Sequence, residues 1–430
     1  MAEPAVYDVS VVGGGPAGVA AAVSAAACGA RVLLVERDAA LGGNVSQALV
    51  HTICGLFLPA EAGDARPVQA GFPMRFASDL LAHGAAGSAE RAGNVWYLPV
   101  DPEGVARRAR ALCETAGLTC WTGCVLREAR APDASSTPWE LHLVGRSGAT
   151  IVRARMLIDA SGDAAAAAAA GADLVEEPPH LLQHPSYIFR LDGVETGELV
   201  GFERMRVSHA VAGAVRRAEL APGCESVVVR PGIRSGQAFV TLNVPKLAGR
   251  PYAPLDEDHR SELEAVARRS AEAVAAHLRH SRAAFRDSRV ACWPTRIGIR
   301  ETRRVRGRAE LSRDDVVTGH RREDEVALSS WPIELWQDHR RARFEHPAAP
   351  CSVPLGCLVS RTHPRLGMAG RCVSATHEAL GALRVVGTAM ATGEAIGVAA
   401  ALAADEDVEL AEVRPEAVRQ RIAGGGFPPE

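Results

Sequence analysis

The stretch Gly-Gly-Gly-Pro-Ala-Gly at residues 13–18 limits the folds open to this chain more than any other feature. It fits the pattern G-x-G-x-x-G. It stands between an apolar run at 6–12, which has the composition of a β-strand, and an apolar helical run at 17–28. A second apolar strand is expected at 31–35. This order predicts a βαβ unit that binds a dinucleotide, with the pyrophosphate at the N-terminus of the helix.

Four residues of this unit have distinct expected roles. Gly13 permits the tight turn, Gly15 lets the backbone approach the pyrophosphate, and Gly18 lets the helix pack closely on the strand. Glu36 ends the second strand 18 residues after Gly18, where its carboxylate can accept hydrogen bonds from both hydroxyls of an adenosine ribose. Together these features disfavour an ordinary glycine-rich turn.

The run that begins at Glu36 favours FAD over NAD as the dinucleotide. It reads Glu-Arg-Asp-Ala-Ala-Leu-Gly-Gly at 36–43, and this E-R-x-x-x-x-G-G pattern resembles the continuation of the fingerprint in the glutathione-reductase-like flavoproteins. The sequence holds one complete G-x-G-x-x-G, so we expect no second domain for a nicotinamide cofactor. A pyridine nucleotide would bind transiently or not at all.

Three further segments resemble the family of FAD-dependent oxidoreductases, which is related to the flavoprotein subunits of succinate dehydrogenase and fumarate reductase. They read I-D-A-S-G-D at 158–163, G-I-R-E-T-R-R at 298–304 and A-G-R-C-V-S-A-T-H-E-A at 369–379. The resemblance spans nearly the whole chain in the same order. It implies the fold and the flavin, but it says little about the reaction because many members of the family have no assigned substrate.

The FAD contacts are expected from the loops that follow the strands of the nucleotide-binding domain. They are Gly13, Gly15, Pro16, Ala17, Gly18, Glu36, Arg37, Gly42, Gly43, Asn44, Val125, Ala160, Gly162, Gly370, Arg371 and Arg384. In such flavoproteins a long helix, expected here at 386–402, points its N-terminus at the pyrimidine end of the isoalloxazine ring. Its dipole would stabilise the negative charge of the reduced flavin.

Three residues are candidates for the chemistry. The resemblance puts His377 beside the flavin ring, where a histidine with a pKa of about 6.5 could move the proton that accompanies hydride transfer. The alternative is a hydrogen-bonded histidine that orders the loop. Arg300, and with it Arg303, could steer an anionic group of the substrate, or they could form structural ion pairs with neighbours such as Glu301. His51 is the third candidate for proton transfer.

His51 lies in a segment, 50–57, that tends in this fold to pass near the dimethylbenzene side of the flavin. Some relatives attach the flavin covalently through a histidine in an S-H-T motif, but here the order is Val-His-Thr at a different spacing, so covalent attachment stays open. Cys54 could be a redox-active thiol, whereas a single cysteine between isoleucine and glycine is more often a small core residue.

The length of 430 residues exceeds one compact core, so we expect two domains. They are an α/β, Rossmann-like FAD-binding domain at 1–174 and 346–430, and an inserted mixed α/β substrate or cap domain at 175–345. The expected elements are loops and short elements at 61–93, a helix at 101–117, an antiparallel ribbon at 119–152 with turns at 131–138 and 145–148, a buried strand at 156–159, strands near 187–191, 226–229 and 237–244, and a helix at 255–278.

Composition excludes several classes of function. The formal net charge of −3 gives no general attraction to nucleic acid or to anionic membranes. The N-terminus has no signal-peptide pattern, so a cytoplasmic location is expected. The alanine-rich stretches at 164–169 and near the C-terminus are too short or too interrupted to span a bilayer and are expected to be buried helices. The ten cysteines contain no C-x-x-C pair, so we expect reduced thiols and no metal site.

These observations favour an FAD-dependent oxidoreductase that acts on a small organic molecule by hydride transfer at the flavin N5. The first alternative is a flavin-dependent monooxygenase, because reduced flavin can react with oxygen. The second is a flavoprotein that modifies a macromolecule, since the tRNA-modifying flavoproteins share the same glycine-rich opening. That alternative requires a basic face, for which the arginine-rich stretch at 300–308 is the one candidate in the sequence. The sequence does not specify the oligomeric state.

Overall fold

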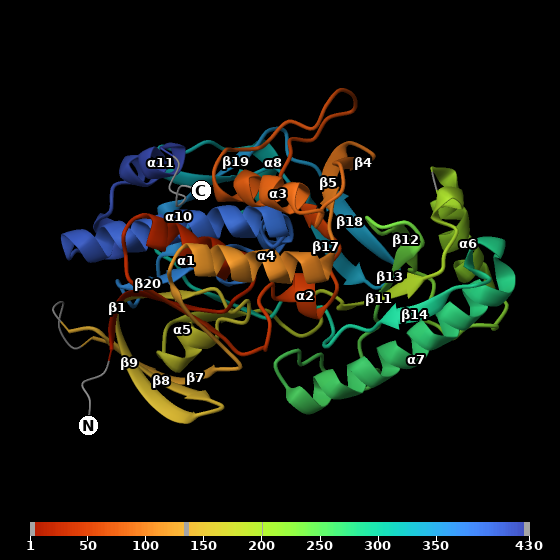
Figure 1. Ribbon diagram of the computed structural model, residues 1–430, viewed down its shortest axis with the longest axis horizontal. Coiled ribbons are helices and arrows are strands. Elements are labelled where there is room, and N and C mark those ends of the chain that lie inside the picture. The colour runs from red at the N-terminus through yellow and green to blue at the C-terminus, as the bar shows by residue number, and fades with distance from the viewer. Residues whose placement is uncertain (1–4, 133–136, 200, 425–430) are drawn as a thin grey trace.

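The computed structural model describes residues 5–132, 137–199 and 201–424. The molecule is elongated, with a nucleotide-binding unit at one end and a smaller sheet-and-helix unit at the other (Figure 1). The central sheet has the order β6-β2-β1-β9-β8-β7, and β20 pairs with the second half of β9. Its strands are β6 (Thr119–Thr122), β2 (Val32–Glu36), β1 (Val6–Val12), β9 (Gly148–Asp159), β8 (Trp139–Gly145), β7 (Val125–Arg130) and β20 (Leu366–Met368).

The predicted βαβ unit is confirmed. Strands β1 and β2 are parallel, with Val9 opposite Val32, and helix α1 (Pro16–Ala27) connects them. Strand β9 lies parallel to β1 on its other side. The carboxyl ends of β1, β2, β9 and β20 therefore meet at one edge of the sheet, which is where ligands bind in open α/β sheets.

The predicted ribbon at 119–152 is confirmed only in part. Strands β7, β8 and β9 form an antiparallel meander, but β6 instead joins the central sheet parallel to β2. A four-residue strand has no pattern that distinguishes these two neighbours, because pairing is decided by the fold. The expected turn at 131–138 includes residues 133–136, which lie outside the described residues.

Helix α10 (Val386–Glu406) is the long helix expected near the C-terminus, and the alanine-rich stretch at 164–169 forms the short helix α5 (Ala165–Ala169). The expectation that this part of the chain is too short or interrupted to span a bilayer was wrong for α10, which has 21 residues and enough apolar character. The expectation of a buried helix is confirmed, since 89% of its most apolar window is buried inside the protein. Its closest partner is α1: Cβ atoms at Gly393 and Gly397 would lie 2.0 and 2.2 Å from carbonyl oxygens of that helix.

The second unit is built on the sheet β12-β13-β11-β14, and we call this sheet the cap sheet. Its strands are β12 (Val228–Pro231), β13 (Gln237–Asn243), β11 (Ser186–Asp192) and β14 (Arg289–Cys292). Helices α6 (Phe202–Arg216) and α7 (Glu257–Ser281) pack with it around a separate hydrophobic core of residues between Leu182 and Ile299 (Figure 1). The strands and the long helix expected in this region are therefore present.

The cap boundary at 345 remains a prediction. Buried side chains between Leu311 and Leu335 pack in the core of the nucleotide-binding unit rather than in the cap core. We therefore propose that the cap itself ends near residue 299. The segment that follows includes strands β15 (Arg303–Val305), β16 (Glu325–Ser329), β17 (Ile333–Asp338) and β18 (Arg341–Glu345), helix α8 (Arg313–Thr318), and then β19 (Cys351–Pro354), which pairs with β16.

The segment at 61–93, expected to be loops and short elements, contains an 11-residue helix, α3 (Phe72–Ala82). The residue before it, Gly71, has no side chain to cap the helix. The cap comes instead from the buried carboxylate of Glu394 on α10, which accepts the N–H of Phe72 at 2.8 Å and binds Arg75 at 3.0 Å. A cap supplied from 322 residues away leaves no local signal in the sequence.

We expect this contact to make stability fall as pH rises. Burial raises the pKa of Glu394 to about 7, and its bonds to Phe72 and Arg75 offset only part of this effect. Between the pKa of an unfolded glutamate and that of Glu394, the native state therefore holds the extra proton, and raising pH favours unfolding. Relative to Glu394→Gln, the wild type should lose on the order of 2 kcal/mol of unfolding free energy between about pH 5 and 8.

Urea unfolding at a series of pH values measures this slope. The matched control is Glu406→Gln, an exposed carboxyl on the same helix, which should leave the pH dependence of the wild type unchanged. Equal slopes for wild type and Glu394→Gln would show that the buried carboxyl is not perturbed.

Candidate active site

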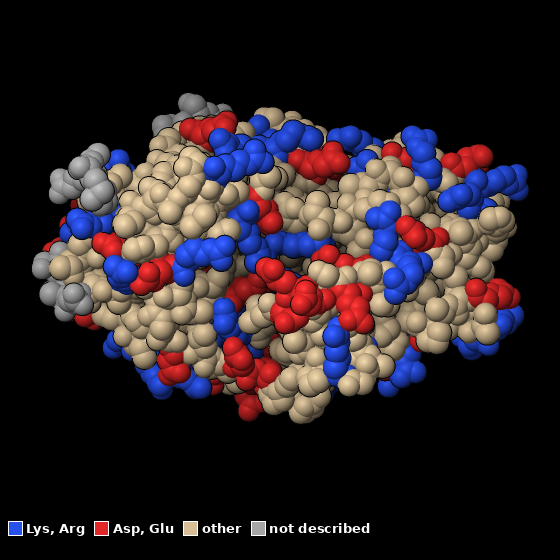
Figure 2. All heavy atoms as spheres, turned by 90° about the horizontal axis from the view of Figure 1, so that it is seen from below, with Lys and Arg blue, Asp and Glu red and all other residues tan. Residues whose placement is uncertain are grey.

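A cavity of about 820 Å³ lies between the carboxyl edge of the central sheet and the cap sheet. Its size falls within the range of sites for small molecules and cofactors. Of the residues that the sequence indicated for FAD or for chemistry, all but three line this cavity; the exceptions are Gly18, Gly42 and His377. Figure 2 shows a hollow near the centre of one face of the molecule, bordered by acidic and basic side chains.

The glycine-rich turn forms one end of the cavity. Gly13 has a φ of +106°, and a Cβ there would lie 2.4 Å from the carbonyl oxygen of Ala160, so only glycine fits. A Cβ at Gly15 would meet nothing closer than the Cα of Gly43, at 3.8 Å. That open space lies at the N-terminus of α1, where backbone N–H groups and the helix dipole favour an anion. The turn therefore fits a pyrophosphate.

Gly18 and Gly42 do not line the cavity, but both contact the glycine-rich turn and help to hold it in place. A Cβ at Gly18 would lie 1.7 Å from the carbonyl oxygen of Gly13, which agrees with the expected role of Gly18 in close helix–strand packing. The N–H of Gly42 donates to the carbonyl of Gly14 at 2.8 Å and ties the second glycine loop to the first. Both residues shape the cavity without lining it.

Glu36 lines the cavity with its carboxylate held by the backbone. One oxygen accepts the N–H of Gly14 at 2.5 Å, and the other accepts the N–H of Asp38 at 2.8 Å. Burial raises the pKa of Glu36, while these two bonds act in the opposite direction. A carboxylate has about four acceptor positions, so each oxygen can still accept a ribose hydroxyl.

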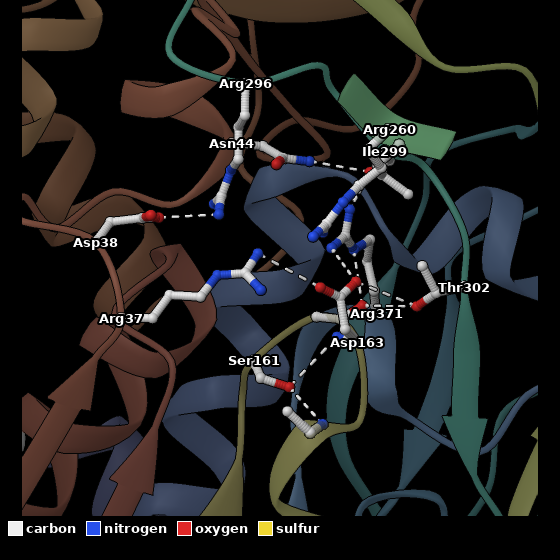
Figure 3. Close-up of polar contacts among 12 residues, drawn as sticks. Arg37, Asp38, Asn44, Ser161, Asp163, Arg260, Arg296, Ile299, Thr302 and Arg371 are labelled. Atoms are coloured by element: carbon white, nitrogen blue, oxygen red, sulfur yellow. Dashed lines mark hydrogen bonds and ion pairs between the residues drawn. The ribbon is translucent and has the colours of Figure 1, made fainter. Parts of the chain in front are cut away.

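Asp163 joins the nucleotide loops to the segment that returns from the cap. Its carboxylate accepts hydrogen bonds from Arg37 at 3.5 Å, from Arg371 at 3.3 Å and from the hydroxyl of Thr302 at 3.2 Å (Figure 3). Arg371 also donates to the carbonyls of Gly162 and Ile299. The same carboxylate therefore holds three parts of the chain that are far apart in sequence.

A second set of contacts joins the nucleotide-binding loops to the segment at 296–299 that returns from the cap. The Nδ2 of Asn44 donates to the carbonyl of Ile299 at 3.1 Å, and Arg296 pairs with Asp38 at 2.9 Å (Figure 3). Arg296 and Arg37 both line the cavity at its nucleotide end. Each has a carboxylate partner, Asp38 for Arg296 and Asp163 for Arg37, so both border the nucleotide end as ion pairs.

The comparisons with known proteins agree with this geometry. The model of the family described as FAD dependent oxidoreductase matches residues 8–422. The chain belongs to this family. FAD is therefore its cofactor. We propose that the cavity is the binding site, because the glycine-rich turn and Glu36 fit the two ends of an ADP group. No curated protein matches the chain.

Similarity to solved structures is remote. A geranylgeranyl bacteriochlorophyll reductase-like protein from Thermoplasma acidophilum is 14% identical, with 97% of this chain and 82% of that chain covered and a TM-score of 0.48. Anhydrotetracycline hydroxylase from Streptomyces rimosus is 14% identical, covers 97% of this chain and has a TM-score of 0.47, and the present chain spans 65% of its length. The p-nitrophenol 4-monooxygenase from Pseudomonas putida is 12% identical, with 98% and 84% covered and a TM-score of 0.46.

Beyond the nucleotide end, the cavity of this flavoenzyme reaches the N-terminus of α10, where Val385, Val386 and Ala389 line it. His51 lies in this region. Its ring stacks on Phe239 of the cap sheet at 4.4 Å, and its Nδ1 faces the carbonyl oxygen of Leu49 at 3.3 Å. A carbonyl only accepts hydrogen bonds, so Nδ1 carries the proton and Nε2 is left as an acceptor. Burial, aided by the charge of Arg230, lowers the pKa of His51 to about 3.

The Nε2 of His51 is buried and has no hydrogen-bond partner within the described residues. An unpaired buried acceptor is costly unless a ligand satisfies it. The side chain is therefore a neutral acceptor in the cavity wall at any physiological pH.

Arg300 and Cys54 also line the cavity. The guanidinium of Arg300 donates to the carbonyl of His184 and, at 2.6 Å, to the side-chain oxygen of Asn243, and it lies over the ring of Trp336. These contacts give it a structural role between the cap and its neighbours. Burial raises the pKa of Cys54 to about 12, so it stays a protonated thiol, which is unsuited to redox exchange.

His377 lies at the start of helix α9 (His377–Leu383) and is not among the described residues that line the cavity. Its Nδ1 is 2.9 Å from the carboxylate of Glu301, which also binds Arg304 at 2.8 Å, and its Nε2 faces Gln337. Burial alone lowers the pKa of His377, but the hydrogen bond and charge of Glu301 outweigh it and raise the pKa. The geometry supports the alternative of a histidine that orders its surroundings, because both ring nitrogens face protein groups.

Sequence reasoning missed several residues of the site. Asp163 is the last residue of the I-D-A-S-G-D segment, but no pattern near it in the sequence predicts that its carboxylate accepts hydrogen bonds from Arg37 and Arg371. The cap-sheet residues and the aromatic side chains of the β17–β18 hairpin were also missed. Their alternation along short strands is a usable signal only when the face that borders the cavity is known.

Proposed function

We propose that this protein oxidises or reduces a small organic molecule, bound between the flavin and the cap sheet. The observation that carries the proposal is the continuity of the cavity: one space runs from the pyrophosphate turn to His51 and the cap sheet. When bound, FAD supplies a two-electron acceptor or donor at its N5. A space that extends past the cofactor site toward a second sheet is suited to a substrate.

The residues of this chain would bind and orient that substrate. The neutral His51 offers Nε2 as an acceptor for a substrate hydroxyl or amine, because no protein group within the described residues satisfies it. The cap sheet and the β17–β18 hairpin cover the cavity and reduce the access of water. The unpaired thiols of all ten cysteines support a reducing compartment, and we propose the cytoplasm.

The arginine-rich stretch at 300–308 does not support a macromolecular substrate. Arg304 is 2% exposed and pairs with Glu177 and Glu301, while Arg306 pairs with Asp173. Arg303 donates to the backbone carbonyl of Asp163. These side chains are engaged within the protein, and Arg308, which is exposed, is a single cation rather than the basic face that binding to RNA needs.

The behaviour of the reduced holoenzyme toward oxygen tests the proposal. Purified protein should show the absorption bands of a flavin that acid precipitation releases into the supernatant. After reduction by light in the absence of oxygen, the protein should be reoxidised more slowly by air than by an artificial acceptor such as ferricyanide. Rapid oxygen uptake, with oxygen incorporated into a product, would instead establish the monooxygenase reaction.

A further inference from the structure

One face of the cap sheet borders the cavity, and the opposite face forms the cap core. Successive side chains of a strand point to opposite faces, and the register places Ser186 opposite Asn243, Ile188 opposite Thr241, and Val228 opposite Thr241. These residues line the cavity. Their neighbours in sequence, such as Tyr187 and Val240, are buried in the cap core.

Arg230 is the charged residue that this face contributes to the cavity. It lies opposite Phe239 in the register, and Phe239 carries the stacked ring of His51. Its guanidinium lies over the ring of Tyr97, 5.1 Å from the ring centre, and its Nε is buried without a partner. Within residues 5–132, 137–199 and 201–424, it pairs with no carboxylate.

The other arginines of this end of the cavity are already engaged. Arg300 is bonded to cap residues, and Arg384 donates to the carbonyl of Glu334 at 3.0 Å and lies 3.9 Å from its carboxylate. Glu334 in turn accepts the indole N–H groups of Trp331 and Trp336. A half-buried cation without an anion is unfavourable, so the unsatisfied charge of Arg230 favours a negatively charged ligand group.

The wall around this cation is aromatic. Tyr97 on β5 (Val95–Pro99), Trp331, Trp336 and Phe344 line the same cavity, and Phe344 is 53% exposed although it is large and apolar. Such rings provide flat apolar surface that packs on a planar ligand. The cavity therefore combines a cation, a neutral acceptor and flat apolar walls.

We propose that the substrate is an aromatic acid: an anion, such as a carboxylate, that pairs with Arg230, on a planar apolar body that packs against the aromatic wall. This inference rests on the proposed function, because it places the substrate in the part of the cavity beyond the flavin cradle. Arg230 determines specificity through charge, while Nε2 of His51 accepts a hydrogen bond from a donor on the same ligand.

Binding of simple probes to the holoenzyme tests this inference without turnover. Benzoate, benzamide and acetate are titrated separately, and binding is followed by the flavin absorption bands and by calorimetry. Benzoate should bind at least ~10-fold more tightly than neutral benzamide or the ring-free acetate, as expected for loss of a charge-assisted pair or of the apolar contact. Arg230→Met should weaken benzoate binding ~10–100-fold and leave benzamide binding almost unchanged.

Two further variants make the result decisive. Arg190→Met removes a cation of the same sheet that pairs with Glu103 and Asp192 and does not line the cavity, so the preference for benzoate should persist. Arg230→Lys retains the charge and should retain the preference, which covers the case in which Arg230→Met does not fold. Equal binding of benzoate and benzamide, no binding of benzoate, or an unchanged preference in Arg230→Met would overturn the inference. Failure of the proposed function would appear separately, as a protein without flavin or without redox activity.

Discussion

Replacing Gly15 with valine should yield a folded protein that no longer retains FAD. Gly15 has a φ of −70° and a ψ of 177°, which any residue can adopt, and its Cβ position is open toward the cavity. The valine side chain would therefore be tolerated by the protein and would fill the space in which the backbone meets the pyrophosphate. Loss of two or three backbone bonds to a charged group corresponds to a decrease in affinity of at least ~10³-fold.

The ratio of flavin to protein after gel filtration measures this effect, and circular dichroism shows that the variant is folded. Gly197→Val is the matched control, since Gly197 has no atom within 4 Å of its Cβ position and does not line the cavity. It should retain a full complement of FAD. A Gly15→Val protein with a normal flavin spectrum would mean that the phosphates bind elsewhere.

Removing the carboxylate of Glu301 should destabilise the protein by about 3–5 kcal/mol, the usual cost of breaking a buried ion pair from one side. Glu301 is 0% exposed and binds both Arg304, which is 2% exposed, and His377. In Glu301→Ala, Glu177 is the one charged partner that the described part of the chain still offers Arg304, and His377 loses its acceptor. Denaturant unfolding of the holoenzyme measures the change in the free energy of unfolding.

The control is Glu219→Ala, which breaks the exposed pair with Arg217 and should leave the free energy of unfolding close to that of the wild type. His377→Ala separates the two roles of the histidine. A structural role predicts lower stability, with FAD retention and turnover largely kept in the folded fraction. Full stability with turnover reduced ~10²-fold or more would instead restore the original expectation that His377 moves a proton at the flavin.

The nucleotide end of the site could be predicted from the sequence because its geometry is local. The turn at Gly13 and Gly15 and the acidic residue at Glu36 belong to one continuous βαβ unit of about 30 residues, so the spacing of residue types determines the arrangement. The second glycine loop, which contains Gly43 and Asn44, comes shortly after Glu36 in the sequence. For these residues the sequence pattern and the structure agree because contacts with distant parts of the chain do little to determine their arrangement.

Two features outside the cavity could not be predicted in the same way. His377 belongs to the segment at 369–379, whose Gly370 and Arg371 line the cavity, yet the orientation of its ring is determined by Glu301, 76 residues earlier in the chain. The helix α3 depends in the same manner on Glu394. In both cases a buried carboxylate from a distant segment decides local structure, and no sequence window contains both partners.

The close crossing of α1 and α10 has a consequence for how the site could change in evolution or by design. Carbonyl oxygens of α1 occupy the positions that side chains at Gly393 and Gly397 would need, so the two helices cannot separate or slide without losing this contact. The part of the cavity wall that these two helices contribute is thus held by a close backbone contact. A bulkier substrate must then be accommodated by residues of the cap sheet and the β17–β18 hairpin, and libraries that aim to widen the substrate range should be directed there.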